Sequence, residues 1–379
     1  MFAPGDDRVG ISDTTVRLCG HGRKYLAKVL GTDDEDFLVY WRWVNDRGGI
    51  HGRGIEERIA EDGGGRLVAQ AYEECRGSFL LRGAPGAEAI IPMRRVVEAD
   101  AHGPPYLHFS VRAEPGAKRS FSFYPSHEAF GRLTAQFVLS RFPGARIGVV
   151  HKASDNWDAG RQGFLAAFRE AGVSVVADVP LSPGDPVVAD ELAAVHRAGA
   201  EVVWAWVELL DFVQLVKQSN AQRHPMRWVA PFAFNTSIEN LGDDALRPAP
   251  LTGLNVTPPA TPGHYTGAFA PYAEEYRRFE DTFRRYRGKP VRRGVADLLF
   301  FKWLEDRHIA DLLEKCGRDC TRNRLVAPLV SGSFSALDPA CAFDFGRGRA
   351  AGYRASAFEA APAEGGPIWV ETIRCADRF

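Results

Sequence analysis

Short apolar runs alternate with amphipathic stretches along the first third of the chain. Four runs have the length and composition of buried strands, at residues 15–19, 55–59, 79–82 and 105–109. Three stretches between them carry apolar residues at helical spacing, at 36–44, 66–75 and 87–97. Strands that alternate with helices in this way predict an α/β lobe built on a parallel sheet.

A second series of the same kind begins at Arg146. Its apolar run at 147–150 is followed by apolar residues at helical spacing, a helix-ending Gly172 and another run at 173–179. This order predicts a right-handed strand–helix–strand unit. The further strands that we expect are at 202–206, 227–230 and 251–257. The further helices that we expect are at 129–140, 188–198, 211–219, 273–286 and 294–316.

Three segments have the composition of linkers, at 118–125, 248–250 and 330–335. A segment rich in proline and glycine at 258–271 interrupts regular structure, and the tail has a hairpin-like pattern around 346–349. The chain of 379 residues therefore suits two α/β lobes rather than one core.

Charge and hydropathy narrow the choice of partners. The net charge is −1 and the basic residues are scattered, which argues against nucleic acid or an anionic membrane as the main partner. No apolar run approaches the roughly 20 residues that a membrane span requires. The polar start of the chain looks like a mature N-terminus behind an added Met, as it would if an export signal had been removed.

Six cysteines, Cys19, Cys75, Cys316, Cys320, Cys341 and Cys375, are candidates for disulfides in an exported protein. A zinc site is disfavoured, because no Cys-x-x-Cys pair or histidine cluster accompanies them. Plain buried thiols remain the alternative. The pairing is not determined by the sequence.

Catalytic motifs are missing from the chain. It contains no Gly-x-Ser-x-Gly elbow, Walker loop or His-Glu-x-x-His motif, and its ten histidines are dispersed. We therefore expect a protein that is not an enzyme and that carries no cofactor and no metal.

Several motifs along the chain resemble those of one family. They are ISDTTVRL, WVNDRGGIHGRGIE, SDNWDAGRQGF and LEKCGRDCTRNRLVAPL. Their order and spacing resemble the type I periplasmic solute-binding proteins of ABC importers, in the branch that binds branched-chain amino acids.

The resemblance implies two doubly wound parallel-sheet lobes joined by a three-segment hinge. Lobe 1 would comprise 1–120 with 250–330, and lobe 2 would comprise 121–249 with 331–379. The lobes would close on a small molecule and deliver it to an ABC permease in the membrane. The protein would be an extracytoplasmic monomer, in the periplasm or at the cell surface, and would serve amino acid transport.

The same resemblance assigns ligand-binding residues to the carboxyl ends of the strands. In lobe 1 they are Ala84, Pro85, Gly86, Ser110, Val111 and Arg112. In lobe 2 they are Trp157, Trp206, Glu208, Asp211 and Phe232.

Three of these positions depart from the family pattern. The glycine–proline loop at 83–86 offers backbone N–H groups but no hydroxyl, and Arg112 adds a cation that can bind a carboxylate. Phe232 lies where relatives carry the acid that binds an ammonium. We therefore expect an amino acid-like, aromatic or hydrophobic carboxylate rather than a simple aliphatic amino acid. Glu208 or Asp211 could still bind an ammonium.

Each candidate also has a structural alternative. Trp157 could cap the core, Trp204 and Trp206 could both pack on the sheet, and Asp211 could be a helix N-cap. Arg112 could be a solvated surface cation.

The function also has alternatives. One is a ligand-sensing receptor domain, and the other is a small-molecule binding protein, or an enzyme, that uses the fold outside transport.

Overall fold

In the computed structural model, the described residues are 2, 5, 7–22, 31–83, 89–108, 117–122, 126–181, 188–223, 226–230, 241, 243–247, 251–255, 270–331, 333–334, 343–344, 355–360 and 368–373. The chain divides into two compact units. Unit 1 comprises Met1–Pro125, Pro271–Val291 and Leu298–Gly352. Unit 2 comprises Ser126–Ala270, Arg292–Asp297 and Tyr353–Phe379.

Unit 1 contains a five-stranded sheet in the order β2-β1-β3-β4-β5, and all of its strands are parallel. The strands are β1 Thr15–Gly22, β2 Gly54–Glu61, β3 Leu80–Gly83, β4 Tyr106–His108 and β5 Ser120–Ser122. The predicted linker at 118–125 therefore contains a strand, because β5 completes the sheet beside β4.

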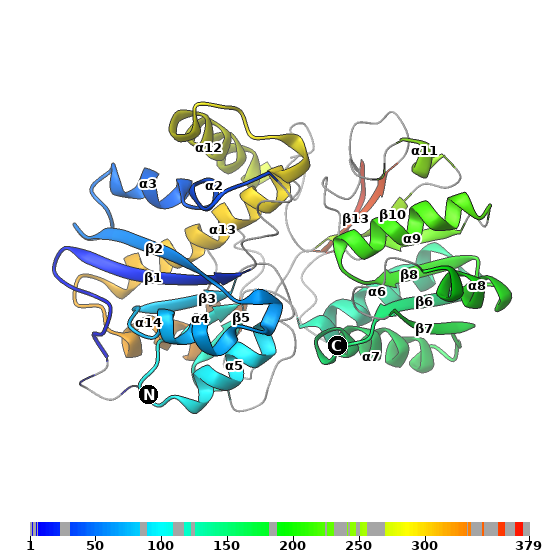
Figure 1. Ribbon diagram of the computed structural model, residues 1–379, viewed down its shortest axis with the longest axis horizontal. Helices are drawn as coiled ribbons and strands as arrows, with labels where there is room; N and C mark the ends of the chain where they lie inside the picture. Colours follow the sequence, from blue (N-terminus) through cyan, green and yellow to red (C-terminus); the bar gives the residue numbers. More distant parts are fainter. Residues whose placement is uncertain are drawn as a thin grey trace. The chain divides into compact units, whose positions relative to one another are not determined.

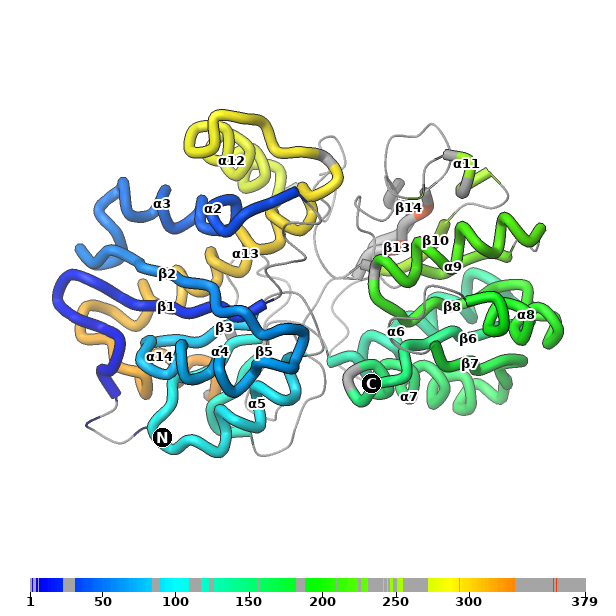
Figure 2. Tube along the Cα trace, in the orientation of Figure 1, coloured from blue at the N-terminus to red at the C-terminus, as the bar shows by residue number. Residues whose placement is uncertain are grey.

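Helices cover both faces of this sheet (Figure 1). They are α2 Asp34–Phe37, α3 Val39–Asn45, α4 Val68–Cys75, α5 Ile90–Ala99, α12 Ala270–Arg287, α13 Arg293–Cys316 and α14 Arg322–Ser331, with a short 3₁₀ helix η1 at Gly63–Gly65. Side chains of α4 and α5 form a buried cluster with Cys19, Leu81 and Tyr106 of the sheet. Residues of α13 contact Arg82, whose side chain points to the opposite face from that of Leu81. Figure 2 shows these late helices, in yellow to orange, beside the blue and cyan strands.

Unit 2 contains a seven-stranded sheet in the order β14-β13-β10-β9-β8-β6-β7. The strands are β6 Ile147–Lys152, β7 Ala177–Leu181, β8 Val202–Trp206, β9 Arg227–Ala230, β10 Leu251–Asn255, β13 Ala355–Ala360 and β14 Ile368–Ile373. The first five are parallel, whereas β13 is antiparallel to β10 and to β14. The second sheet is therefore mixed. The hairpin that the sequence predicts around 346–349 lies outside the described residues, and the antiparallel pair of β13 and β14 lies further along the tail.

The expected return to lobe 1 at residue 250 comes later in the structure. β10 pairs in parallel with β9, so the chain remains in unit 2 through this strand and enters unit 1 again at Pro271. Unit 1 also extends to Gly352 rather than to 330. A pattern of apolar residues locates a strand but does not show which sheet it joins.

The helices of unit 2 are α6 His127–Arg141, α7 Asp155–Glu170, α8 Ala189–Arg197, α9 Leu209–Ala221 and α11 Asp243–Leu246. Two short strands of unit 1, β11 Ser333–Phe334 and β12 Phe343–Asp344, pair with each other apart from both large sheets. α6 and α7 pack closely through glycines. A Cβ on Gly131 would lie 2.0 Å from the carbonyl oxygen of Gly160, and one on Gly163 would lie 2.1 Å from that of Glu128. The two helix backbones therefore touch, and the crossing admits no side chain at these positions.

Two of the motifs that carry the family resemblance contact each other in unit 1. The amide of Asn45 donates to the Ile55 carbonyl at 2.8 Å, and the Ile55 N–H donates back to Asn45 at 2.7 Å. Buried Arg53 donates to the Arg318 carbonyl at 2.7 Å, and Arg318 donates to the His51 carbonyl at 2.8 Å. These motifs fix the loop that enters β2 at the amino end of the sheet, so their contacts shape the fold.

Two disulfides join described cysteines. Cys19 on β1 is bonded to Cys75 at the end of α4, and Cys316 is bonded to Cys320 across the turn after α13. Cys341 and Cys375 lie outside the described residues. The first bond closes a loop with a sequence separation of 56, whereas the second spans a separation of 4.

We expect the two disulfides to stabilise the protein unequally. Loop-closure entropy predicts a loss of about 4 kcal/mol for Cys19→Ala with Cys75→Ala, and about 2 kcal/mol for Cys316→Ala with Cys320→Ala. Urea unfolding followed by circular dichroism would measure both losses. Equal losses, or a larger loss for the second pair, would contradict the prediction.

Candidate functional site

Both sheets contain a topological switch point. In unit 1, β1 lies between β2 and β3, and in unit 2, β6 lies between β7 and β8. In both units the chain therefore leaves the first strand on one side and then continues on the other. Ligands of open α/β sheets bind at the carboxyl ends of the strands at such a point.

Three buried polar side chains meet at the switch point of unit 1. His21, near the end of β1, contacts the Asp62 carboxylate through Nδ1 at 2.9 Å and the Tyr106 hydroxyl through Nε2 at 2.7 Å. Their exposed fractions are 1%, 3% and 0%. Gly83, the partner of His21 on β3, permits this arrangement, because a Cβ there would lie 2.8 Å from the Tyr106 hydroxyl oxygen.

Asp62 is held in place from its other side. Its second carboxylate oxygen accepts a hydrogen bond of 2.8 Å from the N–H of Gly64 in η1. Burial raises the pKa of Tyr106 well above its ordinary value, and the nearby Asp62 acts in the same direction. Tyr106 therefore keeps its proton at all ordinary pH values, and the Asp62–His21–Tyr106 chain is a fixed hydrogen-bonding element.

An aromatic cluster lies at the switch point of unit 2. Trp206 ends β8 and Trp157 lies in the first turn of α7, with their ring centroids 4.9 Å apart. The indole N–H of Trp206 donates to the Trp157 carbonyl at 2.6 Å, and the ring of Phe130 stacks on Trp206 at 5.6 Å. Trp206 is completely buried and Trp157 is 3% exposed. Both rings therefore contribute to packing, and a role for either in ligand contact stays a prediction.

Trp204 has the packing role that its position on the strand predicts. Its ring stacks on Phe164 of α7 at 4.3 Å and on Trp206 at 5.2 Å. The two tryptophans therefore point to the same face of the sheet, where α6 and α7 cover them.

A charged group completes the edge of unit 2. Lys152 is the last residue of β6, and its Nζ lies 3.2 Å from the Glu208 carboxylate and 3.9 Å from the Asp211 carboxylate. Lys152 is 7% exposed, whereas about a quarter of each acid side chain is exposed. Glu208 is the N-cap residue of α9 and Asp211 lies in its first turn, where the helix dipole favours negative charge.

This arrangement changes the chemistry that the sequence predicts for the two acids. Glu208 and Asp211 already face a cation that is almost fully buried, so a ligand ammonium would compete with Lys152 for these two acids. A ligand carboxylate could instead share Lys152 with the acids. The sequence prediction missed Lys152 because it ended the strand at residue 150.

The remaining predicted contacts lie outside the described residues. They are Ala84, Pro85, Gly86, Ser110, Val111, Arg112 and Phe232. His21, Asp62 and Tyr106 are not among the residues that the sequence predicts for the site. The only local signal for them is a polar residue at the end of an apolar run, and their sequence separations of 41 and 85 conceal the contacts.

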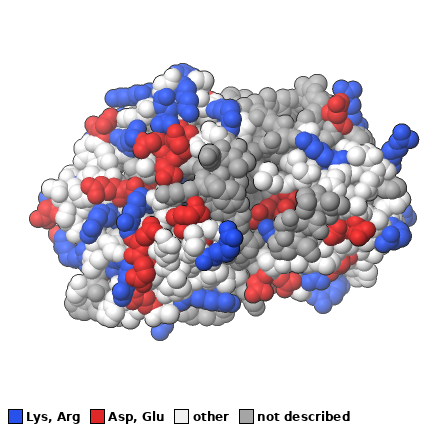
Figure 3. All heavy atoms as spheres, in the orientation of Figure 1, with Lys and Arg blue, Asp and Glu red and all other residues white. Residues whose placement is uncertain are grey.

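Among the described residues, no group of three or more histidine, cysteine or acidic side chains is arranged to hold a metal ion. None of the described helices is long and apolar enough to cross a membrane. On the face drawn in Figure 3, basic and acidic side chains are interspersed over the described surface.

Two doubly wound α/β units, each with a topological switch point, have the architecture of type I periplasmic binding proteins. The chain belongs to the Periplasmic binding protein family, whose profile matches residues 37–358. This is a family of solute-binding proteins, and it implies an extracytoplasmic location. No curated protein sequence matches the chain.

Solved structures share the fold at low sequence identity. A fatty acid ABC transporter substrate-binding protein from Thermomonospora curvata is similar with a TM-score of 0.77 and 16% identity, over 100% of this chain and 97% of that one. A solute-binding protein of an ABC transporter from R. palustris, in complex with benzoate, is similar with a TM-score of 0.73 and 14% identity, over 96% and 98%. A leucine-binding protein from Thermotoga maritima is similar with a TM-score of 0.72 and 14% identity, over 95% and 99%.

The Asp62–His21–Tyr106 chain can be tested by removing one hydroxyl. Tyr106→Phe leaves the buried Nε2 of His21 without this partner, so we expect a loss of about 1–3 kcal/mol in the free energy of unfolding. Tyr286→Phe, which removes an exposed hydroxyl that bonds Asp46, serves as the control and should cost less than about 0.5 kcal/mol. Chemical denaturation of both variants would measure the difference, and equal losses would contradict a structured polar chain.

Proposed function

We propose that this protein is an extracytoplasmic solute-binding protein that captures a small molecule and delivers it to an ABC permease. Membership of the family supports this role, and so does the placement of polar groups at both switch points. The observation that carries the proposal is the ion group of Lys152, Glu208 and Asp211, which lies where this kind of sheet binds ligands.

The solute that fits best is an aromatic or hydrophobic carboxylate. Lys152 supplies a cation at the edge of unit 2, and the apolar cluster around Trp157 adjoins the same edge. A carboxylate that replaces the acids around Lys152 would gain a charge-assisted hydrogen bond. The benzoate complex of the R. palustris protein and the fatty acid protein of T. curvata indicate that the fold accommodates such acids.

An amino acid is the second candidate. Glu208 and Asp211 carry two negative charges against the single charge of Lys152, so the group has a net charge of −1. An α-amino acid could place its ammonium on the outer acid and its carboxylate near Lys152. The leucine-binding protein of T. maritima shows that the fold also serves such a ligand.

A thermal-shift screen distinguishes the two candidates. We expect benzoate, phenylacetate or octanoate to raise the melting temperature and leucine to leave it unchanged, since a ligand at 100 times its Kd stabilises by about 2.7 kcal/mol. Lys152→Gln should abolish the response to the acids, whereas Lys217→Gln, an exposed lysine of α9, should retain it. A shift with leucine alone would overturn the proposed ligand class and leave the transport role intact.

The role of Trp157 requires its own variant. If the indole borders the ligand, Trp157→Ala weakens binding of the responding acid while far-ultraviolet circular dichroism stays that of the folded protein. If the indole serves only the core, the variant loses stability by about 3–5 kcal/mol and binds normally once folded.

A further inference from the structure

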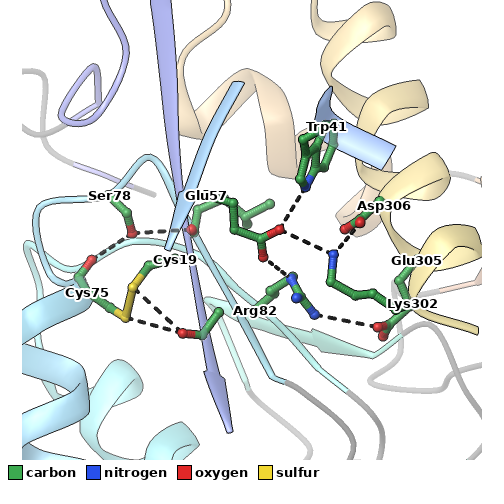
Figure 4. Close-up of polar contacts among 11 residues, drawn as sticks. Cys19, Trp41, Glu57, Cys75, Ser78, Arg82, Lys302, Glu305 and Asp306 are labelled. Atoms are coloured by element: carbon green, nitrogen blue, oxygen red, sulfur yellow. Dashed lines mark hydrogen bonds and ion pairs between the residues drawn. A yellow bond between two sulfur atoms is a disulfide. The ribbon is translucent and has the colours of Figure 1, made fainter. Parts of the chain in front are cut away.

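Five ionisable side chains form a buried network in unit 1, on the face of the sheet that α13 covers (Figure 4). They are Glu57 of β2, Arg82 of β3, and Lys302, Glu305 and Asp306 of α13. At most 6% of any of these side chains is exposed. The network is separate from the Asp62–His21–Tyr106 chain, which lies on the opposite face.

Glu57 lies at the centre of the network. Its carboxylate accepts hydrogen bonds from the Trp41 indole at 2.8 Å, from Lys302 at 3.2 Å and from Arg82. Lys302 also donates to Asp306 on the next turn of the helix. Arg82 reaches Glu305 with a separation of 3.6 Å.

The charges of this network do not balance. Three carboxyl groups face two cations, so the fully ionised network would carry a net charge of −1 in a site without solvent. Glu305 Oε2 and Asp306 Oδ1 are also buried without a hydrogen-bond partner in the described part of the chain. An unbalanced buried charge is costly, and a proton on one of these carboxyl groups removes it.

The electrostatic surroundings favour the protonated form of the same two carboxyl groups, Glu305 and Asp306. Burial raises the pKa of Glu305 to about 8 and that of Asp306 to about 7, and Arg82 and Lys302 only partly oppose this effect. For Glu57, burial also opposes ionisation, but Arg82 and Lys302 outweigh it and hold its pKa below the ordinary value. Glu57 is therefore the ionised acid of the network.

Other titratable groups near the network stay neutral in this range. Burial raises the pKa of Tyr40 on α3 and of Tyr106 on β4 well above neutrality. Burial, aided by Arg307, lowers the pKa of His308 to about 4. Among the described groups that face the network, Glu305 and Asp306 are thus the pair that exchanges a proton near neutral pH.

The network directly adjoins the switch point of unit 1. A Cβ on Gly20 would lie 3.2 Å from Glu57 Oε1 and 3.3 Å from Arg82 Nη2, and His21 is the next residue. Arg82 likewise precedes Gly83, the partner of His21 on β3. The network therefore lies directly beside the two strands that form the candidate site of this unit.

We propose that this network is a binding site for one proton, shared by Glu305 and Asp306, which makes the packing of α13 on the sheet of unit 1 sensitive to pH. With the proton bound the network is neutral, and without it a negative charge is buried. An unfolded chain releases this proton above the ordinary carboxyl range. Stability from this source is therefore fully present below the ordinary carboxyl pKa of about 4, falls as the pH rises above it, and is lost once the pH passes the raised folded pKa of the pair.

Potentiometric titration of the folded protein tests the proton count directly. Between about pH 5 and pH 9 the unmodified chain should release about one proton more than Asp306→Asn. Glu305→Gln should give the same difference, because either variant leaves two acids against two cations. Glu314→Gln, which removes an exposed acid of the same helix outside the network, should keep the extra proton release of the unmodified chain.

The stability of the same variants gives a second measurement. A bound proton that is released on unfolding raises the unfolding equilibrium constant by up to tenfold per pH unit. Urea unfolding should show this pH dependence in the unmodified chain and in Glu314→Gln, and it should be weaker in Asp306→Asn. A pH dependence that is unchanged in Asp306→Asn and Glu305→Gln would overturn the proposal.

One experiment does not depend on folding of the variants. Infrared difference spectra of the unmodified protein should show the carbonyl band of a protonated carboxyl group at neutral pH, and this band should disappear at alkaline pH while the protein remains folded. A spectrum without this band at neutral pH would overturn the proposal.

Discussion

A parallel sheet that helices cover on both faces leaves little room for polar groups except at the ends of its strands. This constraint organises both units of the protein. In unit 2 it places Lys152, Glu208 and Asp211 at the carboxyl edge, while Trp204 and Trp206 fill the covered face. In unit 1 it places His21 at the corresponding edge, where Asp62 and Tyr106 occupy both of its ring nitrogens.

The ion network of unit 1 is the exception to this rule. Arg82 and Glu57 lie inside the covered face, and α13 supplies the partners that compensate them. Replacing a buried network of this kind by apolar residues is often neutral or stabilising. A contribution to folding stability therefore does not by itself explain why the chain contains these charged residues. Its position beside β1 and β3 suggests another role, because the proton that we propose it binds would make the charge next to a candidate site depend on pH.

The sequence predicted much of the framework. The strands at 202–206 and 227–230 have the predicted bounds, since each is a compact apolar run between polar segments. The strand expected at 173–179 begins only at Ala177, because the apolar residues before it belong to the irregular connection after α7. The helix expected at 36–44 is divided at Leu38 into α2 and α3. Period and composition identify an element, whereas its ends depend on contacts that the local sequence does not contain.

The candidate site was harder to predict than the fold. The motif around Asn45 and Arg53 carried the family resemblance, yet its contacts lie at the amino end of the sheet and serve the loop that enters β2. Lys152 was missed although it lies two residues beyond the predicted end of a strand. A resemblance transfers positions along the chain, but the pairing of Lys152 with Glu208 depends on two strands that come together only in the folded sheet.

The contact between α6 and α7 has a consequence for sequence divergence. Gly131 and Gly163 lie where one helix backbone touches the other, and a Cβ on Gly160 would fall 2.4 Å from the Trp206 ring. Drift in sequence can replace apolar core residues by others of similar volume, but it cannot place a side chain where there is no volume. Three glycines with the spacing of Gly131, Gly160 and Gly163, followed by a tryptophan at the end of the second strand after α7, should therefore identify relatives that share this helix contact even where overall sequence identity is low.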